Sequence, residues 1–266
     1  MKTVGLGVSG GVDSAVAAAR LIRKGFAVTA VFMRNWDARH EDAGSQCTLE
    51  ADRASAKQVA DKLGLAFAEV DFVQHYWNHV FQHLLDGYKM GRARNVDVLC
   101  NRHLKFSAFS NHVLQTLGLD ALATGHYARS SFGEFLEHAH PGVKARLFRP
   151  TDTFKDQSGF LSQIPQAGLQ RTMFPLAHAL KPDVREEARK LGLSVQAERE
   201  ESRGICFIGK RNFQDFIDQA NPTLHGFNGD SAPIAMQQSL AIRLAKAQLH
   251  RRLLFGRRYP MILSFS

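Results

Sequence analysis

The sequence predicts an α/β protein built on a doubly wound parallel sheet. Apolar runs of strand length alternate with helical segments, which is typical of parallel strands joined by helices. The first apolar run, Val4–Val8, passes through the hexapeptide Ser9–Ser14 into the Ala-rich segment Ala15–Ala19, so a glycine turn joins a strand to a helix. Ligands of such sheets bind at the carboxyl ends of the strands, which is where we expect this turn to lie.

The further elements follow from hydrophobic periodicity and from helix stop signals. The expected strands after the first are Phe26–Phe32, Leu65–Phe72, Asp120–Thr124 and Arg146–Arg149. The expected helices are one that ends near Lys24, followed by Leu49–Leu63, Tyr76–Met90, His103–Leu117, Lys155–Gln163 and Pro182–Leu191. Gly25, Gly64 and Gly192 stand just after three of these helices, where glycine commonly ends a helix.

Composition limits the class of protein and its partners. With 266 residues, 44% of them hydrophobic, the chain can bury a substantial core. The sequence has no apolar stretch near the roughly 20 residues that a membrane span needs, and no signal-peptide pattern. We therefore expect no membrane partner. The net charge of +9 and a pI of about 9.7 favour a polyanionic partner such as nucleic acid.

The glycine turn Ser9–Ser14 predicts a phosphate site. Its glycines let backbone N–H groups surround an anion, and the helix N-terminus adds the positive end of its dipole. The turn lacks the lysine of the common ATPase loop, and Asp13 suits Mg²⁺ chelation instead. The alternative is an ordinary Gly-Gly turn in which Asp13 only caps the helix. The whole hexapeptide between a strand and a helix favours a nucleotide site.

The three cysteines, Cys47, Cys100 and Cys206, are too widely spaced to indicate a disulfide framework or a CxxC metal motif. This usage fits a reducing compartment. Cys100 follows Asp97 and precedes Arg102, and a neighbouring arginine is expected to lower the pKa of the thiol. Cys206 also has cations nearby. Taken alone, each pattern favours a buried cysteine over a reactive one, but beside a nucleotide loop the two thiols together indicate sulfur chemistry.

Two further patterns can be explained without a binding site. His75, His79 and His83 share one helical face, but the first and last are about 12 Å apart along the axis, too far for a single metal ion, so a solvated polar face is expected. The segment Ser239–Phe255 can form a basic amphipathic helix. Such a helix either contacts phosphates or a membrane surface, or simply packs one face on the protein.

The hexapeptide resembles the PP-loop of the ATP pyrophosphatases, or adenine nucleotide alpha hydrolase-like enzymes, which release pyrophosphate and leave AMP on a substrate oxygen. A series of blocks over roughly residues 1–217 resembles the tRNA-specific 2-thiouridylases of bacteria and mitochondria, in the order of that family. These blocks are S-G-G-V-D-S, F-M-R-N-W-D, D-V-L-C-N-R-H-L-K-F, A-T-G-H-Y-A-R, F-K-D-Q-S, F-P-L and G-I-C-F-I-G-K-R-N-F. Two of them look closer to the mitochondrial branch.

The resemblance implies an ATP-dependent sulfurtransferase. ATP, with Mg²⁺ near Asp13, would adenylate O2 of the wobble uridine of a tRNA. A sulfur relay protein would load Cys206 as a persulfide, whose terminal sulfur replaces the adenylated oxygen. Cys100 would be the nucleophile that attacks the persulfide, either freeing hydrosulfide or forming a Cys100–Cys206 disulfide. Asp97 would assist proton movement, and Cys47 would be structural. The family also implies a monomer located in mitochondria, or alternatively in the bacterial cytoplasm.

The same resemblance assigns binding residues and domains. Those expected at ATP are Gly7, Val8, Ser9, Gly10, Gly11, Val12, Asp13, Ser14, Met33 and Gly125. Those expected at tRNA are Asn95, Val96, Asp97, His126, Lys155, Asp156 and Gln157. The implied organisation is a PP-loop catalytic domain over 1–200, a persulfide-cysteine segment that opens an incomplete second domain over 201–220, and an atypical tail over 221–266.

The chain departs from the family at three places. The family's N-P-D motif reads Asn95-Val96-Asp97, and Gly159 replaces an aromatic residue after K-D-Q-S, so looser local geometry is expected. After about Ile217 the continuation of the family is absent, including its C-terminal β-barrel. We therefore expect a chain that keeps ATP binding and both thiols but grips tRNA poorly.

Three alternatives stay open at this point. The first is another PP-loop ATP pyrophosphatase that acts on small carboxylates, which would need no paired cysteines. The second is an iron–sulfur thiolase-like enzyme, which the distances between the cysteines along the sequence disfavour. The third is a non-catalytic module, or an impaired isoform, that binds tRNA or a partner protein.

Overall fold

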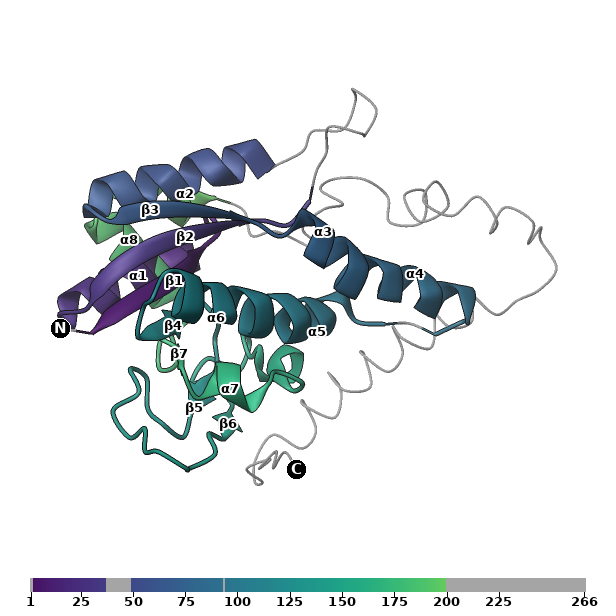
Figure 1. Ribbon diagram of the computed structural model, residues 1–266. Coiled ribbons are helices and arrows are strands. Elements are labelled where there is room, and N and C mark those ends of the chain that lie inside the picture. The colour runs from purple at the N-terminus through teal and green to yellow at the C-terminus, as the bar shows by residue number, and fades with distance from the viewer. Residues whose placement is uncertain (1, 37–48, 93, 200–266) are drawn as a thin grey trace.

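A five-stranded parallel sheet forms the centre of the protein (Figure 1). The computed structural model describes residues 2–36, 49–92 and 94–199. The strands have the order β3-β2-β1-β4-β7. Their bounds are Ala66–Asp71 for β3, Ala27–Arg34 for β2, Thr3–Val8 for β1, Ala121–Ala123 for β4 and Thr172–Met173 for β7. Each pairs in parallel with its neighbours, which confirms the expected α/β fold.

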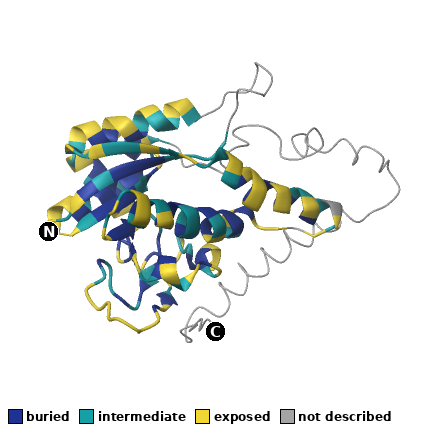
Figure 2. Cartoon of the chain, viewed as in Figure 1, coloured by how far each residue is buried: buried dark blue, intermediate teal, exposed yellow. Residues whose placement is uncertain are grey.

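Helices cover both faces of this sheet because its buried strands are apolar on both faces. One face packs against α1 (Val12–Arg23) and α2 (Leu49–Leu63), and α8 (Lys181–Lys190) packs on α1. The other face packs against a helix that runs from Val96 to Thr116. Figure 2 shows the sheet interior as buried and the outer surfaces of the helices as exposed.

The helix over 96–116 alternates between two hydrogen-bonding patterns. It is α-helical over α5 (Val96–Leu99) and α6 (Phe109–Asn111), and π-helical over η3 (Cys100–Ala108) and η4 (His112–Thr116). It lies very close to β1, because a Cβ added at Gly5 would stand 2.5 Å from Cγ1 of Val113. Gly5 therefore allows the backbone of β1 and this helix to approach each other.

A second helical segment lies beside the first and extends away from the sheet (Figure 1). It consists of α3 (Val73–Tyr76), η2 (Trp77–Phe81) and α4 (Gln82–Lys89). Its apolar face packs on the start of the helix over 96–116 and buries Tyr76, Phe81 and Leu84. The periodicity from Tyr76 onward predicted this helix, which begins three residues earlier than expected.

The structure corrects three of the expected elements. The helix expected to begin at His103 begins at Val96, because the Asn95 side chain caps its N-terminus. The helix expected over 155–163 is only a 3₁₀ turn, η5 (Ser158–Leu161). The carboxylates of Asp152 and Asp156 accept backbone N–H bonds in the preceding segment, which compete with helix formation.

The third correction concerns the strands. The strand expected over 146–149 shortens to β6 (Leu147–Phe148) and pairs antiparallel with β5 (Arg129–Ser130), outside the main sheet. The main sheet instead gains β7, which the sequence did not reveal. Two short helices, α7 (Gln166–Leu169) and α9 (Ser194–Glu198), complete the described elements. None of the helices in the described ranges is long and apolar enough to cross a membrane.

Candidate functional site

The glycine turn after β1 forms one wall of the candidate site. Gly10 has φ +73°, and a Cβ there would lie 2.5 Å from the carbonyl oxygen of Asp52, so only glycine fits. The Ser14 hydroxyl donates to the Gly11 carbonyl at 3.0 Å and accepts from the Ser9 amide at 3.3 Å. Gly11 is the N-cap of α1 and offers no side-chain cap, so the first amides of the helix are left for an anion.

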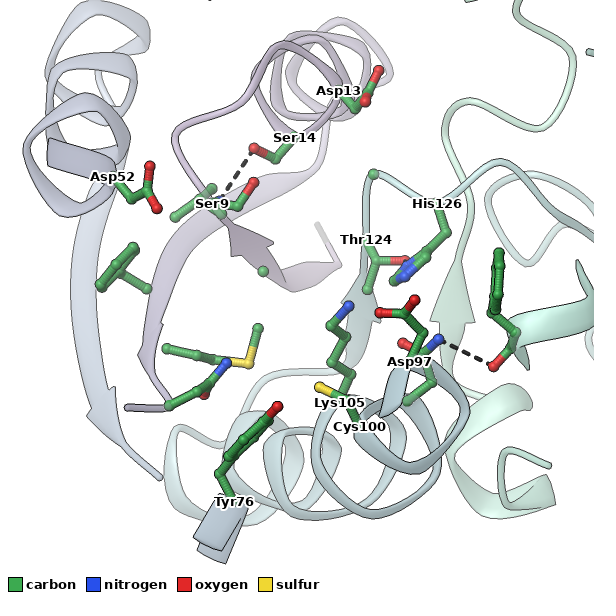
Figure 3. A pocket seen from close by; sticks show the side chains of 18 of the residues that line it. Ser9, Asp13, Ser14, Asp52, Tyr76, Asp97, Cys100, Lys105, Thr124 and His126 are labelled. Atoms are coloured by element: carbon green, nitrogen blue, oxygen red, sulfur yellow. Dashed lines mark hydrogen bonds between the residues drawn. The ribbon is translucent and has the colours of Figure 1, made fainter. Parts of the chain in front are cut away.

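A cavity of about 470 Å³ opens in front of this turn. Figure 3 shows Ser9, Ser14 and Asp52 on one side, and Asp97, Cys100, Lys105, Thr124 and His126 on the other. Eleven of the residues expected at ATP or tRNA line it, together with the expected nucleophile Cys100; the eleven are Gly7, Val8, Ser9, Asp13, Ser14, Met33, Val96, Asp97, Gly125, His126 and Gln157. Elements that are far apart in the sequence thus bring a phosphate turn and a thiol into one cavity.

The other expected residues lie beside the cavity or outside the described residues. Gly10, Gly11 and Val12 belong to the turn, Asn95 and Asp156 directly precede the lining residues Val96 and Gln157, and Lys155 lies two residues before Gln157. Cys47, Cys206 and the segment Ser239–Phe255 fall outside the described ranges.

Cys100 lies on the cavity wall at the junction of α5 and η3. Its side chain is packed among apolar residues and is only 7% exposed. Burial raises the pKa of this thiol, Lys105 lowers it and Asp97 raises it. The expectation that Arg102 lowers this pKa was wrong. The Arg102 guanidinium is turned to the surface, where it donates to Gln163 at 3.3 Å, and the cation that acts on the thiol is Lys105.

The turn over 95–97 is held by Asn95. Its Oδ1 accepts from the amides of Asp97 at 2.9 Å and Val98 at 3.2 Å, and so caps the helix that carries Cys100. Val96, which replaces the family's proline, is buried against the helical segment over 73–89. The cap fixes the turn without proline, and Asp97 stays exposed at the cavity.

The segment after β4 forms the floor near His126. The Nδ1 atom of His126 lies 2.9 Å from the Thr124 hydroxyl, and the ring lies against Phe106. Burial, reinforced by Lys105, lowers the pKa of His126 well below 6.5, so the ring is neutral at physiological pH. Gln157 accepts from the Tyr127 amide at 2.9 Å, which ties the 152–158 turn to this floor.

Asp13 is held by a lysine that the sequence did not single out. The ammonium of Lys181, at the start of α8, donates to both Asp13 oxygens at 2.7 Å, and the Tyr127 hydroxyl donates to Oδ1 at 2.9 Å. Figure 3 shows the carboxylate pointing away from Cys100 and Lys105. The Lys181 ammonium neutralises this carboxylate, so Asp13 does not fit the expected role of a Mg²⁺ ligand.

The cation that the loop itself lacks thus comes from a helix 168 residues away. A second cation lies on the far side of the turn, where Arg199 pairs with Asp52 and donates to the Gly10 carbonyl at 3.3 Å. Sequence reasoning missed Lys181 and Arg199 because no local pattern links them to the turn. It could have found Lys105, which follows Asp97 and Asn101 at intervals of four residues on the same helix.

The histidine face is joined by a fourth ring. The rings of His75 and His79 have centroids 4.4 Å apart, and His103 stacks between the rings of His79 and His83 at 5.9 and 6.2 Å. No three His, Cys, Asp or Glu side chains of the described residues are placed to hold a metal ion.

Comparison with known proteins places this site in a family. The family model described as "tRNA methyl transferase HUP domain" matches residues 2–210. Curated relatives named tRNA-specific 2-thiouridylase include the mitochondrial proteins of Drosophila melanogaster, 50% identical, and Homo sapiens, 43% identical, and MnmA of Acinetobacter baylyi, 44% identical. The chain belongs to the tRNA-specific 2-thiouridylase family.

These matches cover most of this chain but little more than half of each relative. They span 82%, 82% and 83% of the chain, and 56%, 55% and 57% of the fly, human and bacterial proteins respectively. The chain therefore spans little more than half the length of the curated relatives that it matches.

Proposed function

We propose that this chain is the ATP-dependent sulfurtransferase portion of a tRNA-specific 2-thiouridylase and acts on the wobble uridine. The observation that carries the proposal is the single cavity that joins the anion-binding turn to the Cys100 thiol. ATP supplies the AMP that makes O2 of the uridine a leaving group. The turn at Ser9–Ser14 holds the phosphates, and Met33 and Gly125 border the adenosine.

The sulfur step needs a second thiol within reach of this cavity. Arg199 is anchored on the Gly10 carbonyl, and Cys206 follows it by seven residues. Because an extended chain of seven residues spans up to about 25 Å, the sequence separation is short enough for Cys206 to reach the turn. A persulfide on Cys206, loaded by a sulfur relay protein, is our candidate for the sulfur donor.

The proposed chemistry balances without further redox groups in the protein. The terminal persulfide sulfur attacks C2 of the adenylated uridine, the C2–O2 bond breaks, and AMP leaves with the electron pair. The Cys100 thiolate then attacks Sγ of Cys206, which forms the Cys100–Cys206 disulfide and releases the C2 thiocarbonyl. Asp97, exposed at the cavity, takes the proton of Cys100, and an external thiol reductant reduces the disulfide.

The Cys100 thiol is buried and protonated in the structure, so this step requires the cavity to change when tRNA enters. The wobble base must leave the anticodon stack to reach it. Asp97, His126 and Gln157, which line the cavity, are our candidates for base contact, with Lys155 and Asp156 near them in the sequence. A mitochondrial location is part of this proposal and the bacterial cytoplasm is its alternative, because the relatives include mitochondrial proteins, 50% and 43% identical, and a bacterial protein, 44% identical.

The proposal is tested by incubating the chain with an unmodified tRNA transcript, ATP and a persulfide donor, and measuring 2-thiouridine by mass spectrometry. We expect ATP-dependent product that is lost in both C100S and C206S. A transcript with cytidine at the wobble position is the control. Product that survives C100S, or that forms without ATP, contradicts the mechanism.

A further inference from the structure

Lys105 is a cation in the cavity to which the proposed reaction assigns no binding role. Among the described residues that line the cavity, Lys105 is the one lysine or arginine. Its ammonium makes no hydrogen bond or ion pair with another described residue. A half-buried ammonium loses part of its hydration and gains nothing in return until an anion arrives. Its position therefore indicates an anion site.

The charges around Lys105 support this reading. Three carboxylates line the cavity, and their negative charges would repel a nucleotide. Two of these charges are neutralised by cations that do not line the cavity, because Asp13 pairs with Lys181 and Asp52 pairs with Arg199. His126 adds no charge, because its pKa lies well below 6.5. Lys105 and the amides at the start of α1 are then the groups left to balance a phosphate.

The π-helical segment places Lys105 beside the thiol. Residues five apart stand about one turn above each other when hydrogen bonds run from i to i+5, as from the Phe109 amide to the Leu104 carbonyl. Lys105 follows Cys100 by five residues, and Figure 3 shows both side chains on the same wall, with the ammonium directed into the cavity. In an ordinary α-helix the two would diverge.

We propose that Lys105 binds the α-phosphate of the nucleotide, the phosphate that stays on uridine O2 after adenylation. This inference rests on the proposed function. The α-phosphate must lie between the turn and Cys100 when sulfur replaces O2, and Lys105 lies on the wall that faces the turn. There it stabilises the charge that AMP carries away as the C2–O2 bond breaks.

The test uses binding of AMP and adenosine to the whole chain by calorimetry, because the two ligands differ only in this phosphate. We expect K105M to weaken AMP binding about 10- to 100-fold, the effect of losing one charge-assisted hydrogen bond, and to leave adenosine binding within about twofold. K105R keeps the charge and should retain most of the AMP affinity. R102M, on the same helix but directed to the surface, is the matched control and should bind AMP like the unchanged chain.

Equal AMP affinity in K105M and the unchanged chain overturns the inference, even if tRNA thiolation is demonstrated. A shift of the Cys100 alkylation profile in K105M without a change in AMP affinity also overturns it, because Lys105 would then act only on the thiol. If the unchanged chain binds no AMP, the inference and the nucleotide part of the proposed function both fail. If AMP binding behaves as expected while no thiolation is seen, only the proposed function fails.

Discussion

The ion pair between Lys181 and Asp13 should contribute measurably to stability. Lys181→Met removes two charge-assisted hydrogen bonds of 2.7 Å and leaves Asp13 with the Tyr127 hydroxyl. Breaking a fully buried pair costs about 3–5 kcal/mol. Here the lysine side chain is 9% exposed but the carboxylate is 33% exposed, so water compensates in part. We expect a loss of about 2 kcal/mol, or roughly 4–8 °C in Tm.

The assay is urea unfolding of Lys181→Met, Asp13→Asn and the double variant. The double variant should cost less than the sum of the single variants by about 1–2 kcal/mol, because each single change strands the other partner. Lys190→Met is the matched control: that lysine lies on the same helix and makes only a solvent-exposed pair with Glu186, so its loss should leave the unfolding free energy nearly unchanged. A coupling energy near zero would refute the view that α8 holds the turn through this pair.

Three more outcomes follow from the geometry. Gly10→Ala should weaken ATP binding at least about tenfold, measured by calorimetry, and lower the free energy of unfolding by about 1–3 kcal/mol, measured with urea. Gly11→Ala is the control and should change neither quantity, because its Cβ would meet only Ser9 Oγ, at 3.5 Å. In a variant with Cys47 and Cys206 replaced by serine, iodoacetamide should alkylate Cys100 slowly at pH 8 and faster only above pH 9, because burial raises the pKa of the thiol above its ordinary value of 9.0. Rapid alkylation at pH 8 would contradict this prediction. The pKa of His126 is lower in the folded than in the unfolded chain, so the unfolded chain binds more protons as the pH falls below 6.5, and the free energy of unfolding should drop there. His126→Gln should make the free energy of unfolding, measured with urea, less dependent on pH between pH 5 and 7.

The nucleotide turn was predictable from sequence because its signals are local. The apolar run of β1, the glycines and the helix signals after them are contiguous, so the strand, turn and helix were found together. The expected thiol environment failed for the opposite reason. Arg102 is two residues from Cys100 in sequence, yet its helical position turns it to the surface.

The missed features depend on distant partners. β7 is only two residues long and gains its pairing from β4, which no periodicity can reveal. The pairing of Asp13 with Lys181 exists because α8 packs on α1. The expected helix over 155–163 failed because propensity ignores aspartate side chains that accept backbone N–H bonds, as Asp152 and Asp156 do.

The close packing of Gly5 against Val113 sets the width of the cavity. The turn belongs to β1, and the thiol belongs to the helix that rests on β1, so their separation is fixed by van der Waals contact beneath the cavity. This contact works as a spacer. A bulkier residue at position 5 would push β1 away from this helix and so widen the cavity between the turn and Cys100, although Gly5 itself does not line the cavity.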